Sequence, residues 1–133
     1  MFNKILFFGR KNDINCKKIL LLIKRKSKIV KVIWSTNPED KLKSTNLLKH
    51  NYDYIFCFRS FIILKKSLIK KAKYAAINFH PGPPKFRGIG CLNFAIFENA
   101  KFYGVTAHVL DAKIDYGKII NVKRFEILKK DNV

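Results

Sequence analysis

The sequence predicts an α/β protein with a Rossmann-like, open and mostly parallel sheet flanked by helices, and with an antiparallel addition at its C-terminal end. Short apolar runs that end at turn residues alternate with segments of helical periodicity as far as residue 99. Two longer strand candidates then follow with no helix between them. Because strands that are joined through helices usually return in parallel by right-handed crossovers, the alternation predicts the sheet and the final pair predicts the addition.

The apolar runs and turn residues give the order of the elements. Strands are predicted at residues 4–8, 29–34, 54–58, 75–79, 103–110 and 118–127. Helices are predicted after a cap at Asn12 or Asp13, from the turn at 36–40 through Leu48, and at residues 64–72 and 91–99. The buried side of the first helix is expected to comprise Ile14, Ile19, Leu20, Leu22 and Ile23.

Length and composition restrict the class of protein. The 133 residues are 48% hydrophobic, which is enough for a core, and they predict one domain over 1–133. The apolar run at residues 5–8 is too short for a signal segment or a membrane span, so we expect a soluble, cytoplasmic protein without a membrane partner. Cys16, Cys57 and Cys91 are odd in number and lack metal-site spacing, so we expect small buried side chains.

A net charge of +19 favours an anionic partner such as a phosphate, a tRNA or the carboxylates of a folate. However, lysine outnumbers arginine 23 to 5, and the lysines are spread along the chain. Arginine is the residue that binds phosphate in bidentate geometry. We therefore attribute the larger part of the charge to codon bias and the smaller part to a partner.

Asn78 and His80 are the strongest candidates for chemistry. They are two residues apart at the end of a predicted strand, so their side chains project from the same face. A rigid segment with three prolines, residues 81–84, follows directly. Taken alone, the asparagine is more often a turn former and the histidine a structural residue. Together with Asp115 in a later loop, the arrangement favours an active site.

These residues lie in three motifs that together resemble a known family. The motifs are INFHPGPPKFRG at 77–88, YGVTAH at 103–108 and DYGKII at 115–120. In this order and spacing they resemble the catalytic domain of the formyltransferases that use 10-formyltetrahydrofolate. This family includes enzymes that act on methionyl-tRNA, glycinamide ribonucleotide and amino sugars.

The resemblance implies that Asn78, His80 and Asp115 are catalytic. An amine attacks the formyl carbon of 10-formyltetrahydrofolate, and the carbonyl oxygen becomes an oxyanion that needs hydrogen-bond donors. Asn78 and protonated His80 are expected to donate to it, while Asp115 orients His80 and helps to move the amine proton. The resemblance implies no metal. Thr106 and His108 share a face of one predicted strand, and we expect them to be structural.

The resemblance also predicts where the folate donor binds. The segment after the third strand, with Ile62, Ile63 and Leu64, corresponds to the stretch of the family that faces the pterin ring. The loop 111–115, with Asp111 and Ile114, is expected to contribute backbone groups. An ordinary place in the core is nearly as good an interpretation of the three apolar residues.

The chain also departs from the family. The loop after His80 is one residue shorter than the usual Ser-Leu-Leu-Pro, and the region between Trp34 and Asp53 is short. The chain ends at Val133, before the closing elements of the family, so we expect a domain that is short or truncated at its C-terminus: a fragment, a minimal version or a degenerate paralogue.

The leading hypothesis is formyl transfer to a primary amine, with a methionyl-tRNA-like or an amino-sugar nucleotide acceptor both open. One alternative is hydrolysis of the same folate, with water replacing the amine. The other is a truncated domain that binds folate or RNA without turnover.

Overall fold

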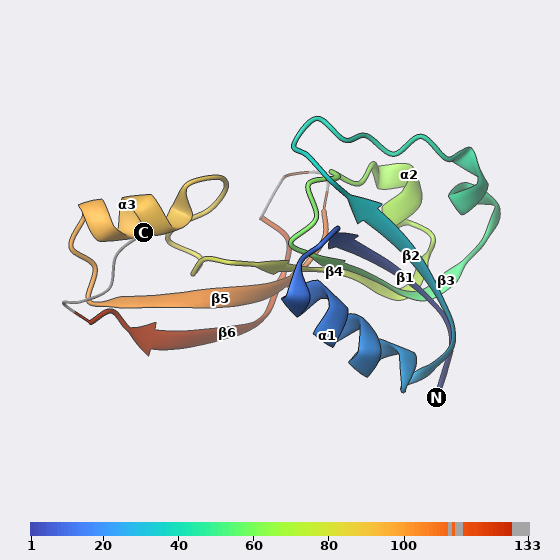
Figure 1. Ribbon diagram of the computed structural model, residues 1–133, viewed down its shortest axis with the longest axis horizontal. Coiled ribbons are helices and arrows are strands. Elements are labelled where there is room, and N and C mark those ends of the chain that lie inside the picture. Colours follow the sequence, from blue (N-terminus) through green and yellow to red (C-terminus); the bar gives the residue numbers. More distant parts are fainter. Residues whose placement is uncertain (112, 114–115, 129–133) are drawn as a thin grey trace.

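In the computed structural model, six strands form one sheet with the order β2-β1-β3-β4-β5-β6 (Figure 1). The structure describes residues 1–111, 113 and 116–128. The strands are β1 (Phe2–Arg10), β2 (Ser27–Ser35), β3 (Tyr52–Phe58), β4 (Ala72–His80), β5 (Phe102–Val109) and β6 (Ile119–Glu126). The first four are parallel, and β5 and β6 are each antiparallel to the preceding strand. The predicted fold class, including the antiparallel addition, is confirmed.

Helices flank this sheet on both faces. They are α1 (Ile14–Lys24), the 3₁₀ helix η1 (Thr45–Lys49), α2 (Lys66–Ile69) and α3 (Cys91–Phe97). Figure 1 shows α1 and α2 on opposite sides of the sheet. The chain moves from β1 to β2 in one direction, then past β1 to β3 and β4 in the other, so right-handed crossovers send the connecting helices to opposite faces. No helix in the described part of the chain is long and apolar enough to cross a bilayer.

The main core lies between the sheet and the side that carries α2 and η1. Its buried residues are Leu6, Phe8, Leu47, Tyr52, Ile55, Cys57, Ile62, Leu64, Leu68 and Ala76. The central strand β1 is buried along five consecutive residues, 5–9, because both of its faces are covered. A second, smaller cluster joins α3 to β5 and consists of Phe86, Cys91, Ala95 and Tyr103.

The expected buried side of α1 is only partly correct. Leu20 is buried, and Ile19 and Ile23 are half-buried, but Ile14 is 62% and Leu22 is 56% exposed. The helix instead buries Cys16 and Leu20, which are four residues apart and therefore lie on one face. The apolar periodicity placed the helix correctly but assigned too wide a buried face to it.

Two of the helix predictions are wrong in extent. The predicted helix at 64–72 is reduced to α2, because residue 72 already pairs with Tyr52 in the β3–β4 ladder. The predicted helix after the turn at 36–40 is only the 3₁₀ turn η1. Asp40 accepts hydrogen bonds from the backbone and hydroxyl of Thr36, which closes this turn on itself before any helix begins.

The N-terminus of α1 confirms one of the two predicted caps. Asp13 Oδ1 accepts a hydrogen bond from Cys16 N at 2.9 Å, and Oδ2 forms an ion pair with Arg59 Nε at 2.9 Å. The backbone hydrogen bond from Cys16, assisted by the charge of Arg59, lowers the pKa of Asp13. This carboxylate therefore fixes the start of α1 and ties it to the end of β3.

We expect Asp13→Ala to lower the free energy of unfolding by about 1 kcal/mol, because the helix loses its capping acceptor. Asp13→Asn keeps that acceptor and should cost less than half as much in urea unfolding at neutral pH. A carboxylate with a lowered folded pKa stabilises the fold above its unfolded pKa and loses this effect as the pH falls through the folded value. The difference between the wild type and Asp13→Asn should therefore shrink below about pH 4. Equal losses for both variants at neutral pH would show that the cap contributes nothing.

Candidate active site

The carboxyl ends of the four parallel strands meet at one edge of the sheet. Strand order reverses around β1, which lies between β2 and β3, and ligands of open α/β sheets bind at such a switch point. Arg10, Ser35 and His80 are the last residues of β1, β2 and β4 at this edge. The predicted catalytic histidine therefore lies where the fold itself favours a site.

Antiparallel pairing between β4 and β5 brings four polar residues together. Asn78 is opposite His108, and His80 is opposite Thr106. Directly opposed residues in a ladder project from the same face, which agrees with the expected common face of Asn78 and His80. A small hollow at this position is lined by His80, Pro84, Arg87, Thr106, His108 and Ile119.

His108 holds the amide of Asn78. Its Nδ1 lies 3.0 Å from the carbonyl oxygen of Val109, and its Nε2 lies 3.2 Å from Asn78 Nδ2. A carbonyl can only accept, so Nδ1 carries a proton, and the Nε2 of a neutral ring then accepts from the amide. His108 is 2% exposed. The buried ring thus fixes which end of the Asn78 amide is the nitrogen, and it orients a hydrogen-bond donor beside the hollow.

His80 is buried beneath the proline-rich loop that follows it. Its Nε2 lies 2.9 Å from the carbonyl oxygen of Phe86. Gly82 also lies against the ring, and a Cβ at this position would be 2.7 Å from His80 Nε2. The loop therefore packs directly onto the imidazole.

Cys57 pairs with Asn78 in the neighbouring ladder. Burial raises the pKa of the Cys57 thiol to about 12, so the thiol stays protonated near neutral pH and is a poor nucleophile. All three cysteines are buried and free, as predicted.

The three apolar side chains of the predicted folate segment differ in how far they are buried. Ile62 and Leu64 are each 8% exposed and belong to the main core, which agrees with the alternative interpretation, whereas Ile63 is 70% exposed. Of the three side chains, Ile63 is the one that is open to a ligand. Asp111 is exposed, and Asp115 and Ile114 lie outside the described residues.

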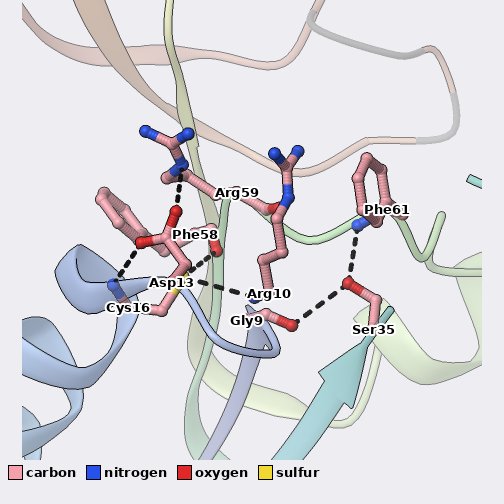
Figure 2. A network of polar contacts seen from close by, with 8 residues as sticks. All are labelled: Gly9, Arg10, Asp13, Cys16, Ser35, Phe58, Arg59 and Phe61. Carbon is pink, nitrogen blue, oxygen red and sulfur yellow. Dashed lines mark hydrogen bonds and ion pairs between the residues drawn. The ribbon is translucent and has the colours of Figure 1, made fainter. Parts of the chain in front are cut away.

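A polar network anchors the backbone of this segment at the carboxyl edge (Figure 2). Ser35 is fully buried, and its hydroxyl donates to the carbonyl oxygen of Gly9 at 3.1 Å and accepts from Phe61 N at 3.0 Å. Ser60 Oγ lies 3.4 Å from the same hydroxyl and accepts from Ile62 N at 3.1 Å. One serine therefore links the ends of β1 and β2 to the start of the segment.

Three arginines make the edge positive. Arg59 adopts a left-handed backbone conformation with φ 55°, and its carbonyl accepts from Arg10 Nε at 3.2 Å. The guanidinium of Arg10 lies 3.9 Å from the centroid of the Phe61 ring. Arg87, at the hollow, lies 4.1 Å from the centroid of the Tyr116 ring. These permanent cations suit an anionic ligand. Among the described residues, no group of three or more His, Cys, Asp or Glu side chains could hold a metal ion.

Sequence reasoning missed three features of the site. It did not find the contact between His108 and Asn78, the carbonyl of Phe86 on His80, or the two hydroxyl groups of Tyr103 and Thr106 that hold the loop. The common strand of Thr106 and His108 was a usable signal, since both residues alternate with apolar neighbours. The carbonyl contact has no signal in side-chain identity.

Comparisons with known proteins identify the family of the chain. The family model described as Formyl transferase matches residues 15–133. The bifunctional polymyxin resistance protein ArnA of Wigglesworthia glossinidia brevipalpis is 36% identical over 86 residues, which are 64% of this chain and 13% of that protein. The methionyl-tRNA formyltransferase of Thermodesulfovibrio yellowstonii is 30% identical over 98 residues, 70% of this chain and 32% of that enzyme. The chain therefore spans less than a third of the length of either relative.

Solved structures show the same fold. Phosphoribosylglycinamide formyltransferase from Bacillus halodurans superposes with a TM-score of 0.75 at 19% identity, covering 97% of this chain and 82% of that one. HypX from Aquifex aeolicus in complex with tetrahydrofolic acid superposes with a TM-score of 0.67 at 24% identity, over 93% of this chain and 21% of that one.

We expect Ser35→Ala to lower the free energy of unfolding by about 1–3 kcal/mol, because two buried backbone groups lose their partner. Ser27→Ala is the matched control at the other end of β2: this serine is also buried, but its hydroxyl donates one hydrogen bond, to Ile29. It should cost about 1 kcal/mol or less. Both values come from urea unfolding. If the two losses are equal, Ser35 does not anchor the edge.

Proposed function

We propose, from the premise that this chain belongs to the formyl transferase family, that it transfers a formyl group from 10-formyltetrahydrofolate to a primary amine. The observation that carries the proposal is the pairing of Asn78 with His108 and of His80 with Thr106 at the carboxyl edge of the sheet. This arrangement presents an oriented amide donor and a titratable imidazole side by side. Acyl transfer to an amine needs both groups.

In the proposed mechanism, the folate supplies the formyl group and the protein supplies the hydrogen bonds. Asn78, oriented by His108, donates an amide N–H to the formyl oxygen as negative charge develops there. His80 in its protonated form donates to the same oxygen. Asp115 stabilises that protonated ring and moves the proton of the attacking amine toward the leaving folate nitrogen. The roles of these three residues are proposals that follow from the family motifs.

The folate is proposed to bind between the segment after β3 and the loop 111–115. Ile63 offers an exposed apolar side chain there, and Ile62 and Leu64 hold the backbone of the segment against the core. Asp111 and Ile114 are proposed to contribute backbone groups that read the pterin ring. The presence of tetrahydrofolic acid in the HypX structure, which has the same fold, supports a folate ligand.

The acceptor is proposed to be an amine that carries phosphate, of the methionyl-tRNA or amino-sugar nucleotide kind. The name of the methionyl-tRNA formyltransferase relative supports the first class, and the arginines at the edge suit an anionic group. The family fold is shared by a phosphoribosylglycinamide enzyme, so this third acceptor belongs in the same assay.

Asn78→Ala should lower formyl transfer by about 10²–10³-fold, the usual loss for one oxyanion donor. His80→Ala should lower it by about 10²–10⁴-fold, as expected for a general acid–base residue. The assay follows formylated amine from each candidate acceptor with 10-formyltetrahydrofolate. Asn93→Ala and His50→Ala are matched controls at exposed positions and should keep wild-type rates.

The same assay separates the competing functions. Formate released in the absence of an amine, at a rate matching turnover with an amine, would identify hydrolysis instead of transfer. Tetrahydrofolate binding without any turnover would identify a binding domain. An Asn78→Ala, His80→Ala double variant with undiminished transfer would refute the proposed centre.

A further inference from the structure

We infer that Tyr103 and Thr106 are positioning residues of the transfer centre: they hold the loop 81–86 so that the carbonyl of Phe86 accepts the Nε2–H of His80. The bond keeps a proton on this nitrogen and sets the orientation of the ring. The inference rests on the proposed function, because it specifies how His80 is set for that reaction.

The contact with Phe86 determines which nitrogen of the His80 imidazole carries a proton. The distance of 2.9 Å between His80 Nε2 and the Phe86 oxygen is that of a hydrogen bond, and a carbonyl oxygen can only accept. Nε2 therefore carries a proton in either charge state of the ring. A neutral ring then has its acceptor at Nδ1, and a protonated ring donates from Nδ1 as well. In both states Nε2 remains the nitrogen that donates to the loop.

Two side-chain hydroxyls hold the loop 81–86 in place. Tyr103 Oη donates to the carbonyl oxygen of Pro81 at 2.7 Å, and Thr106 Oγ1 donates to the carbonyl oxygen of Gly82 at 2.7 Å. These two hydroxyls come from one strand, β5, and bind two consecutive carbonyls. Both side chains are buried, and burial raises the pKa of the Tyr103 phenol, so it remains a donor across the physiological range.

The loop also packs closely against the His80 ring. A Cβ on Gly82 would lie 2.7 Å from His80 Nε2 and 2.7 Å from the Phe86 oxygen, so no larger residue fits without a shift. Phe86 is fixed on both sides: its N–H donates to Pro83 at 2.9 Å, and its buried ring stacks on Tyr103 with centroids 6.4 Å apart. The accepting carbonyl has little freedom to move away from the imidazole.

Proline content explains why side-chain hydroxyls are needed. Three of the four residues at 81–84 lack a backbone N–H, so the segment cannot be held by a regular backbone ladder. Tyr103 and Thr106 supply hydroxyl donors to two of its carbonyls, and the Cys91 thiol, 3.4 Å from the Pro81 oxygen, is a weaker third donor. Because the two hydroxyls act on His80 through the loop, their loss should change the orientation of the imidazole and thus kcat, with little change in the KM for folate.

The experiment combines NMR spectroscopy with kinetics on the whole chain. With ¹⁵N-labelled histidine, only three rings are visible, and His50→Gln removes the exposed one. In its neutral form His80 should carry its proton on Nε2, and neutral His108 should carry it on Nδ1 because Nδ1 donates to Val109. His108 is therefore an internal reference of the opposite tautomer.

Three variants test the clamp, the pair of hydrogen bonds from Tyr103 and Thr106 to the loop 81–86. Thr106→Val and Tyr103→Phe each remove one hydroxyl at nearly constant shape, and Thr106→Ser keeps the hydroxyl. In the Thr106→Val, Tyr103→Phe double variant, which loses both hydrogen bonds to the loop, the His80 signals should move toward exchange between the two tautomers, and kcat should fall about tenfold or more. Thr106→Ser should therefore show the wild-type His80 signals and most of the wild-type rate. Tyr74→Phe, which removes a hydroxyl from an exposed tyrosine, is the matched control and should change neither.

Wild-type His80 with its proton on Nδ1 would overturn the inference, and so would a double variant with unchanged His80 signals. If Thr106→Val prevents folding, Tyr103→Phe alone decides the question by the same signals, because it keeps the ring that packs on Phe86. The NMR measurement needs no substrate. A chain that shows the expected tautomers but no formyl transfer would therefore refute the proposed function while supporting the clamp. A chain that transfers the formyl group but lacks the expected tautomers would refute the clamp while supporting the proposed function.

Discussion

The pairing of β4 with β5 is the constraint on which the candidate site depends. Opposing Asn78 to His108 and His80 to Thr106 places all four polar side chains on one face of the sheet. If the pairing shifted by one residue, either Asn78 and His80 or Thr106 and His108 would project from the other face of the sheet, since side chains alternate along a strand. The ladder is antiparallel, so β5 returns directly beside β4 and can present a buried histidine to the asparagine. The positions of these four side chains are thus set by backbone hydrogen bonds.

A second layer of contacts supports the same edge from the other strands. Ser35 links the ends of β1 and β2 to the segment after β3, and Asp13 links the start of α1 to Arg59. Both contacts use a small buried or half-buried polar group to bind backbone or a guanidinium, and they connect the loops to neighbouring strands. The loop after β4 is held in the same manner by hydroxyls. The edge is therefore rigid on both sides of His80, as a centre that orients two substrates requires.

Much of the fold could be predicted from the sequence because short apolar runs and turn residues determine where strands begin and end. All six strands were predicted, and the common face of Asn78 and His80 followed from strand periodicity alone. The predicted helix at 64–72 failed because pairing with Tyr52 extends β4 backward to residue 72, a tertiary contact that overrides local preference. The burial of Ile62 and Leu64 was undecidable from an apolar run, since a ligand wall and a core look alike in sequence. The carbonyl of Phe86 on His80 could not be predicted, because it depends on how the loop folds back on the ring.

The central claim is that the carboxyl edge around Asn78 and His80 is a folate-dependent transfer site. The most direct measurement is an NMR titration of the chain with tetrahydrofolate, following backbone and histidine signals. The account predicts saturable shifts that are largest at His80 and His108 and in residues 61–64, while exposed signals at the far end of the sheet, near Lys28, stay unchanged. Saturable binding with its shifts elsewhere and none at His80 or 61–64, or no binding, would contradict the account.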